Sequence, residues 1–239
     1  MRLIRPAWSV PGVQAFSTTR TGGVSSGPWT SFNLGLACGD NPDAVRENRR
    51  RLQTKLPSPP LWLKQVHGAR VIHADEWRSK IEADAVWTDR AQQVLTIQTA
   101  DCLPILLAAE DGRVIGAAHA GWRGLVADIP GALVEALPVS PTTLMAWIGP
   151  GIGAEHYAVG ESVREEFLGL SQCLDMAFST GVDGTLYCDL KEIARYLLTR
   201  AGVSEIQDCG LCTASDAERF FSYRRDGDCG RMVSCIWKT

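Results

Sequence analysis

The chain has 239 residues, of which 45% are hydrophobic, and a formal net charge of -3. A chain of this length can bury a large core, and we expect residues 1–239 to form a single catalytic domain. The small negative charge excludes the basic field that draws proteins onto nucleic acid or acidic lipid. We therefore expect neither a nucleic-acid partner nor a membrane partner.

The start of the chain predicts a cytoplasmic protein. It reaches Pro6 and Pro11 before any apolar run as long as the core of a signal peptide. The longest apolar stretch, 102–109, is interrupted by Pro104 and is too short to cross a bilayer. The eight cysteines are therefore expected to be reduced thiols.

The first elements alternate between loops, helices and short strands. The first forty residues, rich in Gly, Ser and Thr, predict a strand followed by an ordered loop. A helix then begins at Pro42, capped by Asn41 or Asp40, and places positions 45, 52 and 56 on one face. Six β-rich runs follow, bounded by Gly, Asp or Pro: 61–66, 70–74, 84–88, 94–99, 103–108 and 114–118.

The remaining pattern predicts more helix than strand. Residues 121–137 have helical spacing with a break or kink at Pro130, 144–148 returns to a strand, and 162–170 is a short helix. Asp189 caps a longer helix that Gly202 ends, and 232–237 is a final strand. Strands and helices thus alternate irregularly, which predicts an α/β fold with a mixed sheet, a layered α/β sandwich, rather than a doubly wound parallel sheet.

Two of the four histidines lie in glycine-rich segments that follow strand-like runs. They are His67 in KQVHG and His119 in AAHAGWRG, and Cys102, in TADCLP, starts another strand between them. The three positions are too far apart in sequence for a compact zinc finger, so they must converge through the fold. Singly, each is more often a packed or solvated side chain than a metal ligand.

If the three converge, two imidazoles and a thiolate give a tetrahedral zinc three ligands and leave the fourth position for water. Zinc lowers the pKa of such a water to about 7. Asp101, next to the cysteine, and Asp84, in EADAVWTD, are candidate proton shuttles or partners of the imidazoles.

The same atoms allow other chemistry. Cys102 activated by His119 is the minimal pair for acyl transfer by a cysteine nucleophile. Two histidines and a cysteine also describe a blue-copper centre, but multicopper oxidation needs a histidine cluster, and only His73 and His156 remain. A protein that binds metal or a partner without turnover is a third class.

Arginines in loop-like segments are candidate ligands for phosphate or carboxylate. They are Arg20 in STTRTGG, Arg123 in AGWRG, and Arg224 with Arg225 in FFSYRRD, and for Arg225 a surface salt bridge is an equally good interpretation. Cys209 and Cys212 form a C-x-x-C without a second pair, which gives little support for another metal or redox centre.

Taken together, these segments resemble the bacterial family of purine nucleoside phosphorylases, also called laccase-domain proteins, polyphenol oxidases or peptidoglycan editing factors. The matching stretches span nearly the whole chain: STTRTGGVS, NLGLACGDNPDAVRENR, WLKQVHG, ADAVWTD, TADCLPILL, AAHAGWRG, WIGPGIG, YAVG and FFSYRRDGDCGRM. One departure is Leu211, where many relatives carry arginine before the Cys-Thr pair.

The resemblance implies a zinc site, with copper possible, whose ligands fall on His67, Cys102 and His119. It implies phosphorolysis of adenosine, inosine and S-methyl-5′-thioadenosine to base and ribose phosphate, together with deamination of adenosine. The expected partners are thus small purine nucleosides and phosphate, and the expected substrate-binding residues are Arg20, Asn33, Arg123 and Arg224.

It also implies a fold similar to the catalytic domain of cytotoxic necrotizing factor, a cysteine-histidine deamidase. That similarity supports the alternative of a Cys102–His119 hydrolase acting on an amide or a peptidoglycan precursor. No pattern in the sequence indicates an oligomeric state.

Overall fold

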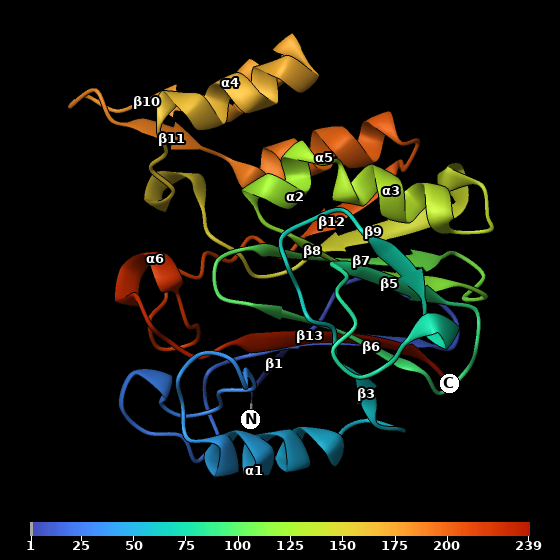
Figure 1. Cartoon of the computed structure of the whole chain (residues 1–239). Helices are drawn as coiled ribbons and strands as arrows, with labels where there is room; N and C mark the ends of the chain where they lie inside the picture. Colours follow the sequence, from blue (N-terminus) through green and yellow to red (C-terminus); the bar gives the residue numbers. More distant parts are fainter. Residues whose placement is uncertain (1) are drawn as a thin grey trace.

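The computed structural model describes residues 2–239 and consists of layered β-sheets and helices (Figure 1). The strands are β1 (Leu3–Ile4), β2 (Val13–Thr18), β3 (Pro60–Leu61), β4 (Val71–His73), β5 (Ala85–Thr88), β6 (Val94–Thr99), β7 (Leu103–Ala109), β8 (Ile115–Ala120), β9 (Leu144–Ile148), β10 (Phe178–Thr180), β11 (Leu186–Cys188), β12 (Glu205–Asp208) and β13 (Met232–Lys238). The α-helices are α1 (Pro42–Gln53), α2 (Trp122–Val126), α3 (Ile129–Ala136), α4 (Glu161–Leu170), α5 (Leu190–Arg200) and α6 (Tyr223–Asp226).

Two mixed sheets form the centre. One has six strands in the order β12-β9-β7-β8-β5-β4, with parallel pairs at both edges and antiparallel pairs between. The other has five strands in the order β1-β2-β13-β6-β3 and is antiparallel except for the β6–β3 pair. The expected α/β fold with mixed sheets is therefore confirmed. Its likeness to cytotoxic necrotizing factor and its single domain over residues 1–239 stay predictions.

The core lies in three layers because side chains alternate along each strand. In β7, Ile105 and Leu107 face α2, α3 and α5, whereas Leu106 packs between the two sheets. A third apolar layer joins the five-stranded sheet to α1, with Phe16 and Leu52 fully buried. The order of layers is thus helices, six-stranded sheet, five-stranded sheet and α1, as Figure 1 shows.

Most predicted elements form close to their expected bounds. The Asn41 side chain caps α1, and the Asp189 side chain caps α5 by accepting from two backbone N–H groups. Gly202 follows α5 with a φ of 95°, a conformation that glycine adopts without strain. The strand expected at 94–99 has the same bounds as β6.

Three local predictions are wrong. The strand expected at 61–66 ends at Leu61, because beyond it the Gln65 side chain, rather than a main-chain ladder, bonds the backbone of β6. The strand expected to end at 118 continues through His119, so this histidine lies within β8 and not after it. The helix break falls at Asp128, whose side chain caps α3, and Pro130 lies inside the first turn of α3.

The sequence did not indicate the hairpin β10–β11, the edge strand β12 or the short helix α6. Each is brief and partly exposed, so it lacks a clear apolar period. Over the described residues, no helix combines the length and apolar character needed to cross a bilayer.

Candidate metal centre

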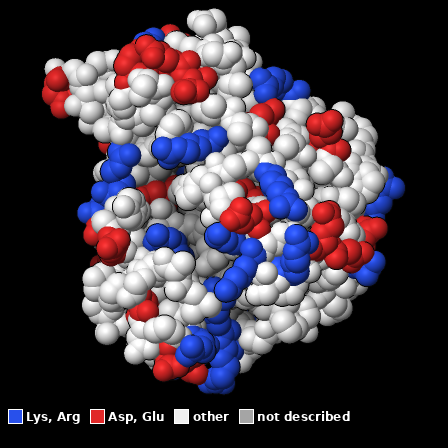
Figure 2. Space-filling view, in the orientation of Figure 1, with Lys and Arg blue, Asp and Glu red and all other residues white. Residues whose placement is uncertain are grey.

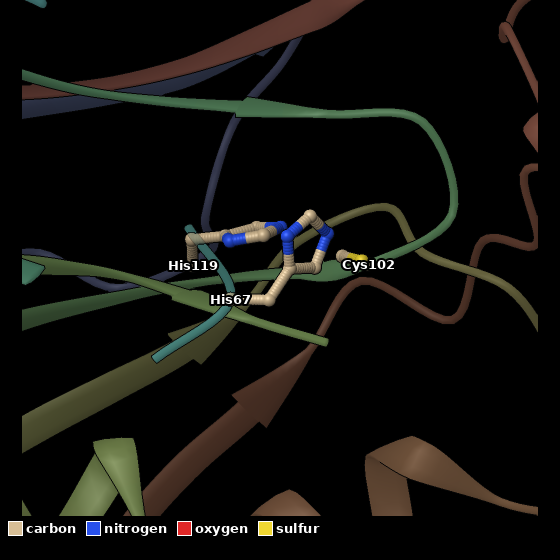
Figure 3. Close-up of side chains that lie close together, drawn as sticks. All are labelled: His67, Cys102 and His119. Carbon is tan, nitrogen blue, oxygen red and sulfur yellow. The ribbon is translucent and has the colours of Figure 1, made fainter. Parts of the chain in front are cut away.

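Three segments that are distant in sequence bring His67, Cys102 and His119 together. His67 lies in the loop before β4, Cys102 directly precedes β7, and His119 lies near the end of β8. Their potential ligand atoms lie within 4.8 Å of one another, and the two imidazole rings are 4.7 Å apart at a steep angle of 75°. Figure 3 shows the three side chains lying close together. The convergence that the sequence required is present.

Asp84 holds two of the three segments in place. Its buried carboxylate accepts backbone N–H groups from Val66 at 3.1 Å, His67 at 2.9 Å and Gly68 at 2.9 Å. The same carboxylate lies 2.8 Å from His119 Nδ1, and the Asp84 carbonyl accepts the His119 N–H at 2.7 Å. Consecutive N–H groups form a natural cradle for an anion.

This arrangement orients both histidines. His67 has a φ of 62°, a left-handed conformation that is costly for a residue with a side chain and persists here because Asp84 binds the backbone around it. The contact with Asp84 turns Nδ1 of His119 toward the carboxylate, so that Nε2 is the nitrogen available to the ligand group. A carboxylate behind a histidine is the usual support of a metal-binding imidazole.

The electrostatics favour charged forms in this cluster. Burial of Asp84 opposes ionisation, but the hydrogen bonds from His119 and the backbone outweigh it and lower the pKa of the carboxyl. Burial of Cys102 also opposes ionisation, yet the neighbouring His119 and His67 lower the pKa of its thiol. The pKa of His119 is raised, although burial opposes protonation, because Cys102 and Asp84 stabilise its cation. A thiolate is the form that binds metal.

Gly121 leaves the space that the cluster needs. A Cβ atom at this position would lie 2.7 Å from Cys102 Sγ and 3.4 Å from His67 Cδ2. Because the first of these distances is below any normal contact, a side chain there would push the thiol out of place. The glycine of the HAGWRG stretch therefore has a steric role beside the ligands.

The three residues line a cavity of about 670 Å³, within the range of sites for small molecules. Its other lining residues are Gly35, Ala37, Cys38, Leu63, Lys64, Gln65, Gln98, Thr99, Ala100, Asp101, Trp122, Arg123, Tyr157, Tyr223, Arg224 and Arg231. Figure 2 shows basic side chains around the hollowed part of this face. The cavity thus combines aromatic walls with an excess of positive charge.

Two of the predicted substrate-binding arginines lie in the cavity. Arg123 is exposed, stacks over Trp122 at 4.3 Å, and makes no side-chain hydrogen bond within residues 2–239. Arg224 stacks over Tyr157 at 4.7 Å and donates to the Ala158 carbonyl at 2.6 Å. Arg123 is therefore the cavity arginine with the most freedom to bind an anion.

Arg20 and Asn33 lie outside the cavity lining. Arg20 donates to the carbonyls of Thr30 and Ala217 and stacks over Phe221. Asn33 is fully buried, and both atoms of its amide are bonded within the protein, including a bond from the Arg231 N–H at 2.8 Å. These contacts support the cavity wall, and direct substrate binding by either residue stays a prediction.

Asp101 lines the cavity but has partners for both carboxylate oxygens. It accepts the Thr213 hydroxyl at 2.6 Å and the Arg224 N–H at 2.7 Å. These bonds fasten the turn that carries Cys102 to the start of α6. Proton transfer by Asp101 stays a prediction, and these contacts also give Asp101 a structural role.

Several cavity residues were missed in the sequence. Gln65 donates to the Gln98 carbonyl and accepts the Gln98 N–H, both at 2.8 Å, and so joins the His67 loop to β6. Tyr157 and Arg231 were not singled out, although they lie in the matching stretches YAVG and FFSYRRDGDCGRM. The signal for Gln65 was its place in KQVHG, two residues before the predicted ligand His67.

The donor set fits a metal ion. Two imidazoles and a thiolate suit zinc, and also copper, and the cavity leaves an open side for a further ligand. Within residues 2–239 this is the single cluster of three metal-binding side chains. Cys209 and Cys212 belong to no such cluster, and Cys212 accepts the Gly153 N–H at 3.1 Å.

The layered fold and this open three-ligand group define the class, a mixed α/β protein with a His-Cys-His group that could bind a metal. The chain belongs to the family described as multi-copper polyphenol oxidoreductase laccase, whose model matches residues 14–239.

The similar proteins extend over almost the entire chain. A protein named purine nucleoside phosphorylase YfiH from Escherichia coli (strain K12) is 45% identical over 99% of this chain and 98% of its own length. A purine nucleoside phosphorylase from Haemophilus influenzae is 42% identical over 99% of both. The crystal structure of Neisseria meningitidis protein NMB0706 superposes with a TM-score of 0.95 at 39% identity, covering 100% of this chain and 99% of that chain.

The family description and the names of these relatives point to different chemistry. Multicopper oxidation requires more histidines than one cluster provides. Outside the cluster, His73 packs at 4.5 Å against Trp87 and contacts Asp75 and Asp89, and His156 lies in a short 3-10 turn. The described residues therefore contain no second histidine cluster of the kind that multicopper oxidation requires.

Proposed function

We propose that this chain is a zinc-dependent purine nucleoside enzyme. It cleaves adenosine and inosine with phosphate to a free base and ribose 1-phosphate, and S-methyl-5′-thioadenosine to adenine and the 5-methylthio derivative of ribose 1-phosphate. It also deaminates adenosine. The observation that carries the proposal is the opening of the His67–Cys102–His119 group into a basic cavity, in a chain whose relatives bear the name purine nucleoside phosphorylase.

Phosphorolysis needs a place for a dianion beside the reacting sugar. Arg123 makes no hydrogen bond or ion pair through its side chain within the described chain and can donate a forked pair of hydrogen bonds to phosphate, and Arg224 lines the same cavity. Zinc bound by the three ligands would supply Lewis-acid polarisation of a substrate or water oxygen. Asp84 keeps the His119 Nδ1 proton in place, so that Nε2 stays directed toward the ligand group.

In the sugar transfer, a phosphate oxygen forms the bond to C1′ as the C1′–N9 bond breaks. The electron pair leaves with the purine, and the proton of hydrogen phosphate ends on the purine. Oriented binding of both reactants accounts for much of such an acceleration. The deamination replaces the 6-amino group by water and releases ammonia, without use of phosphate.

A second candidate is a cysteine hydrolase that acts on an amide or a peptidoglycan precursor. The observation in its favour is the order Cys102, His119, Asp84, in which a thiol with lowered pKa lies beside a histidine that a carboxylate orients. In this hypothesis, alkylation of Cys102 abolishes turnover and added metal does not restore it.

The deciding experiment is chromatography of zinc-quantified protein incubated with adenosine, with and without phosphate. Adenine that forms only with phosphate, and inosine that forms without it, support the two proposed reactions separately. Cys102→Ala is expected to lose both zinc and turnover, whereas the matched variant Cys173→Ala, at an exposed cysteine outside the cluster, keeps both. Full turnover by a zinc-free Cys102→Ala protein would overturn the proposal.

A further inference from the structure

Gln98 lines the cavity, and its side-chain amide makes no hydrogen bond within the described residues. Gln98 lies in β6 and lines the cavity, and its main chain bonds the Gln65 side chain in both directions. Among residues 2–239, no group makes a hydrogen bond with the Gln98 side chain, although Lys64, Arg224 and Arg231 in the same cavity all have protein partners. The Gln98 amide is therefore free to bind a ligand.

Gln98 and Arg123 lie on opposite sides of the layer that carries the metal ligands. Cys102 and His119 belong to the six-stranded sheet, α2 with Arg123 lies in the helix layer outside it, and Gln98 belongs to the five-stranded sheet (Figure 1). A nucleophile approaches C1′ opposite the leaving base. Phosphate bound at Arg123 and a sugar near the metal ligands therefore direct the purine toward Gln98.

We propose that Gln98 recognises the purine base through the edge formed by N1 and the 6-substituent. This inference rests on the proposed function and adds the residue that recognises the base. A glutamine amide carries one acceptor and one donor group in a plane, which is why such amides pair with the edge of adenine. With adenosine, the amide oxygen accepts from the 6-amino group and the amide nitrogen donates to N1.

A half-turn of the amide adapts the same residue to inosine. The amide nitrogen then donates to the 6-oxygen and the amide oxygen accepts from the N1 proton. Rotation about the last torsion of glutamine is soft, and no protein partner of Gln98 resists it. One site thereby accepts both 6-amino and 6-oxo purines, the range that the proposed function includes.

The test compares adenosine with purine riboside, which keeps N1 and lacks the 6-substituent, as substrates for phosphorolysis by wild type and Gln98→Leu. Wild type is expected to prefer adenosine in kcat/KM. In Gln98→Leu the ratio of kcat/KM for adenosine to that for purine riboside is expected to fall about tenfold, which corresponds to about 1.4 kcal/mol. The zinc content of this variant is expected to stay unchanged. The main-chain bonds from Gln65 do not depend on the side chain at position 98, so the variant retains the contact that shapes the wall.

Gln98→Glu provides the second measurement. A carboxylate still accepts from the 6-amino group of adenosine or from the N1 proton of inosine, but it cannot donate to N1 of adenosine or to the 6-oxygen of inosine, so kcat/KM is expected to fall for both nucleosides. An unchanged preference in Gln98→Leu together with unchanged kcat/KM in Gln98→Glu, with a wild type that converts both nucleosides, would overturn this inference and leave the proposed function intact. A wild type that converts neither nucleoside overturns both.

Discussion

Replacing Asp84 by asparagine tests how one carboxylate organises the candidate metal site. Asp84→Asn keeps the shape of the side chain but exchanges one acceptor for a donor. An amide nitrogen at the position that contacts Val66 and Gly68 would leave two N–H groups without an acceptor. An amide nitrogen at the position that contacts His119 would leave only the His67 N–H without an acceptor, so this orientation of the amide is favoured.

In that orientation the amide nitrogen donates to Nδ1 of His119, which moves the ring proton to Nε2, the atom needed for metal binding. Loss of a carboxylate behind a metal-binding histidine weakens the affinity for metal by about 10- to 100-fold. The His67 N–H loses a bond to a charged acceptor, which lowers the free energy of unfolding by about 1.5–3 kcal/mol. We therefore expect weaker zinc binding together with lower stability.

The assay is competition for zinc against a chelator at neutral pH, accompanied by urea unfolding of the metal-free protein. Asp111→Asn is the matched control, because this exposed carboxylate contacts Arg113 and lies outside the cluster. A zinc affinity of Asp84→Asn equal to that of the wild type would refute the role assigned to Asp84.

The pH dependence follows from the lowered pKa of Asp84 in the folded protein. A carboxyl with a lowered folded pKa adds stability above its unfolded pKa of about 3.9, and that stability is lost as the pH falls through the folded pKa. Although burial opposes protonation, the charges of Cys102 and Asp84 raise the pKa of His119 to about 9, which adds stability that is full below the unfolded pKa of about 6.5 and is lost as the pH rises through about 9. The difference in unfolding free energy between wild type and Asp84→Asn should therefore be largest between about pH 4 and 6.5 and shrink on either side. A difference that grows below about pH 4 contradicts this reasoning.

Three further predictions concern the neighbours of the cluster. In chelator-treated protein, iodoacetamide should label Cys102 at neutral pH faster than it labels an ordinary thiol, and bound zinc should slow this labelling. Mass spectrometry measures the labelling, and a rate that does not change with zinc argues against thiolate ligation. Gly121→Ala should weaken zinc binding without unfolding the protein, because the backbone there is extended while the added Cβ meets Sγ; unchanged affinity would show that the thiol can move aside. Gln65→Leu should lower the free energy of unfolding by about 1–3 kcal/mol, from its two bonds to Gln98, in a urea titration, and no loss would mean that water replaces both.

The His67–Cys102–His119 group could be predicted from the sequence because histidines are rare in the chain. With four histidines, the two in glycine-rich segments stood out, and the family resemblance joined them to Cys102. Asp84 was also proposed as a partner of the imidazoles, and the structure places it against His119. What the sequence could not provide is the cradle of three N–H groups, since backbone contacts leave no residue signature.

One strand prediction failed because a side chain takes the place of the main chain. The run at 61–66 is rich in residues typical of strands, but Gln65 pairs with β6 through its amide, so the main chain is free to turn toward His67. Asn33 carries a polar group typical of ligand sites, and both atoms of its amide bond to the surrounding chain, so substrate binding by Asn33 stays a prediction. Polar residue type predicts hydrogen bonding, whereas the partner depends on tertiary structure.

The position of β13 has a consequence for how the chain acquires its structure during synthesis. This strand lies between β2 and β6, and Ser17 of β2 bonds Ser234 of β13 across 217 residues of sequence. Until the ribosome has released residues 232–238, one side of β2 and one side of β6 remain open edges, which invite pairing with other chains. The five-stranded sheet must therefore be completed late, and a nascent chain that carries only the six-stranded sheet is the stage at which protection by a chaperone would matter most.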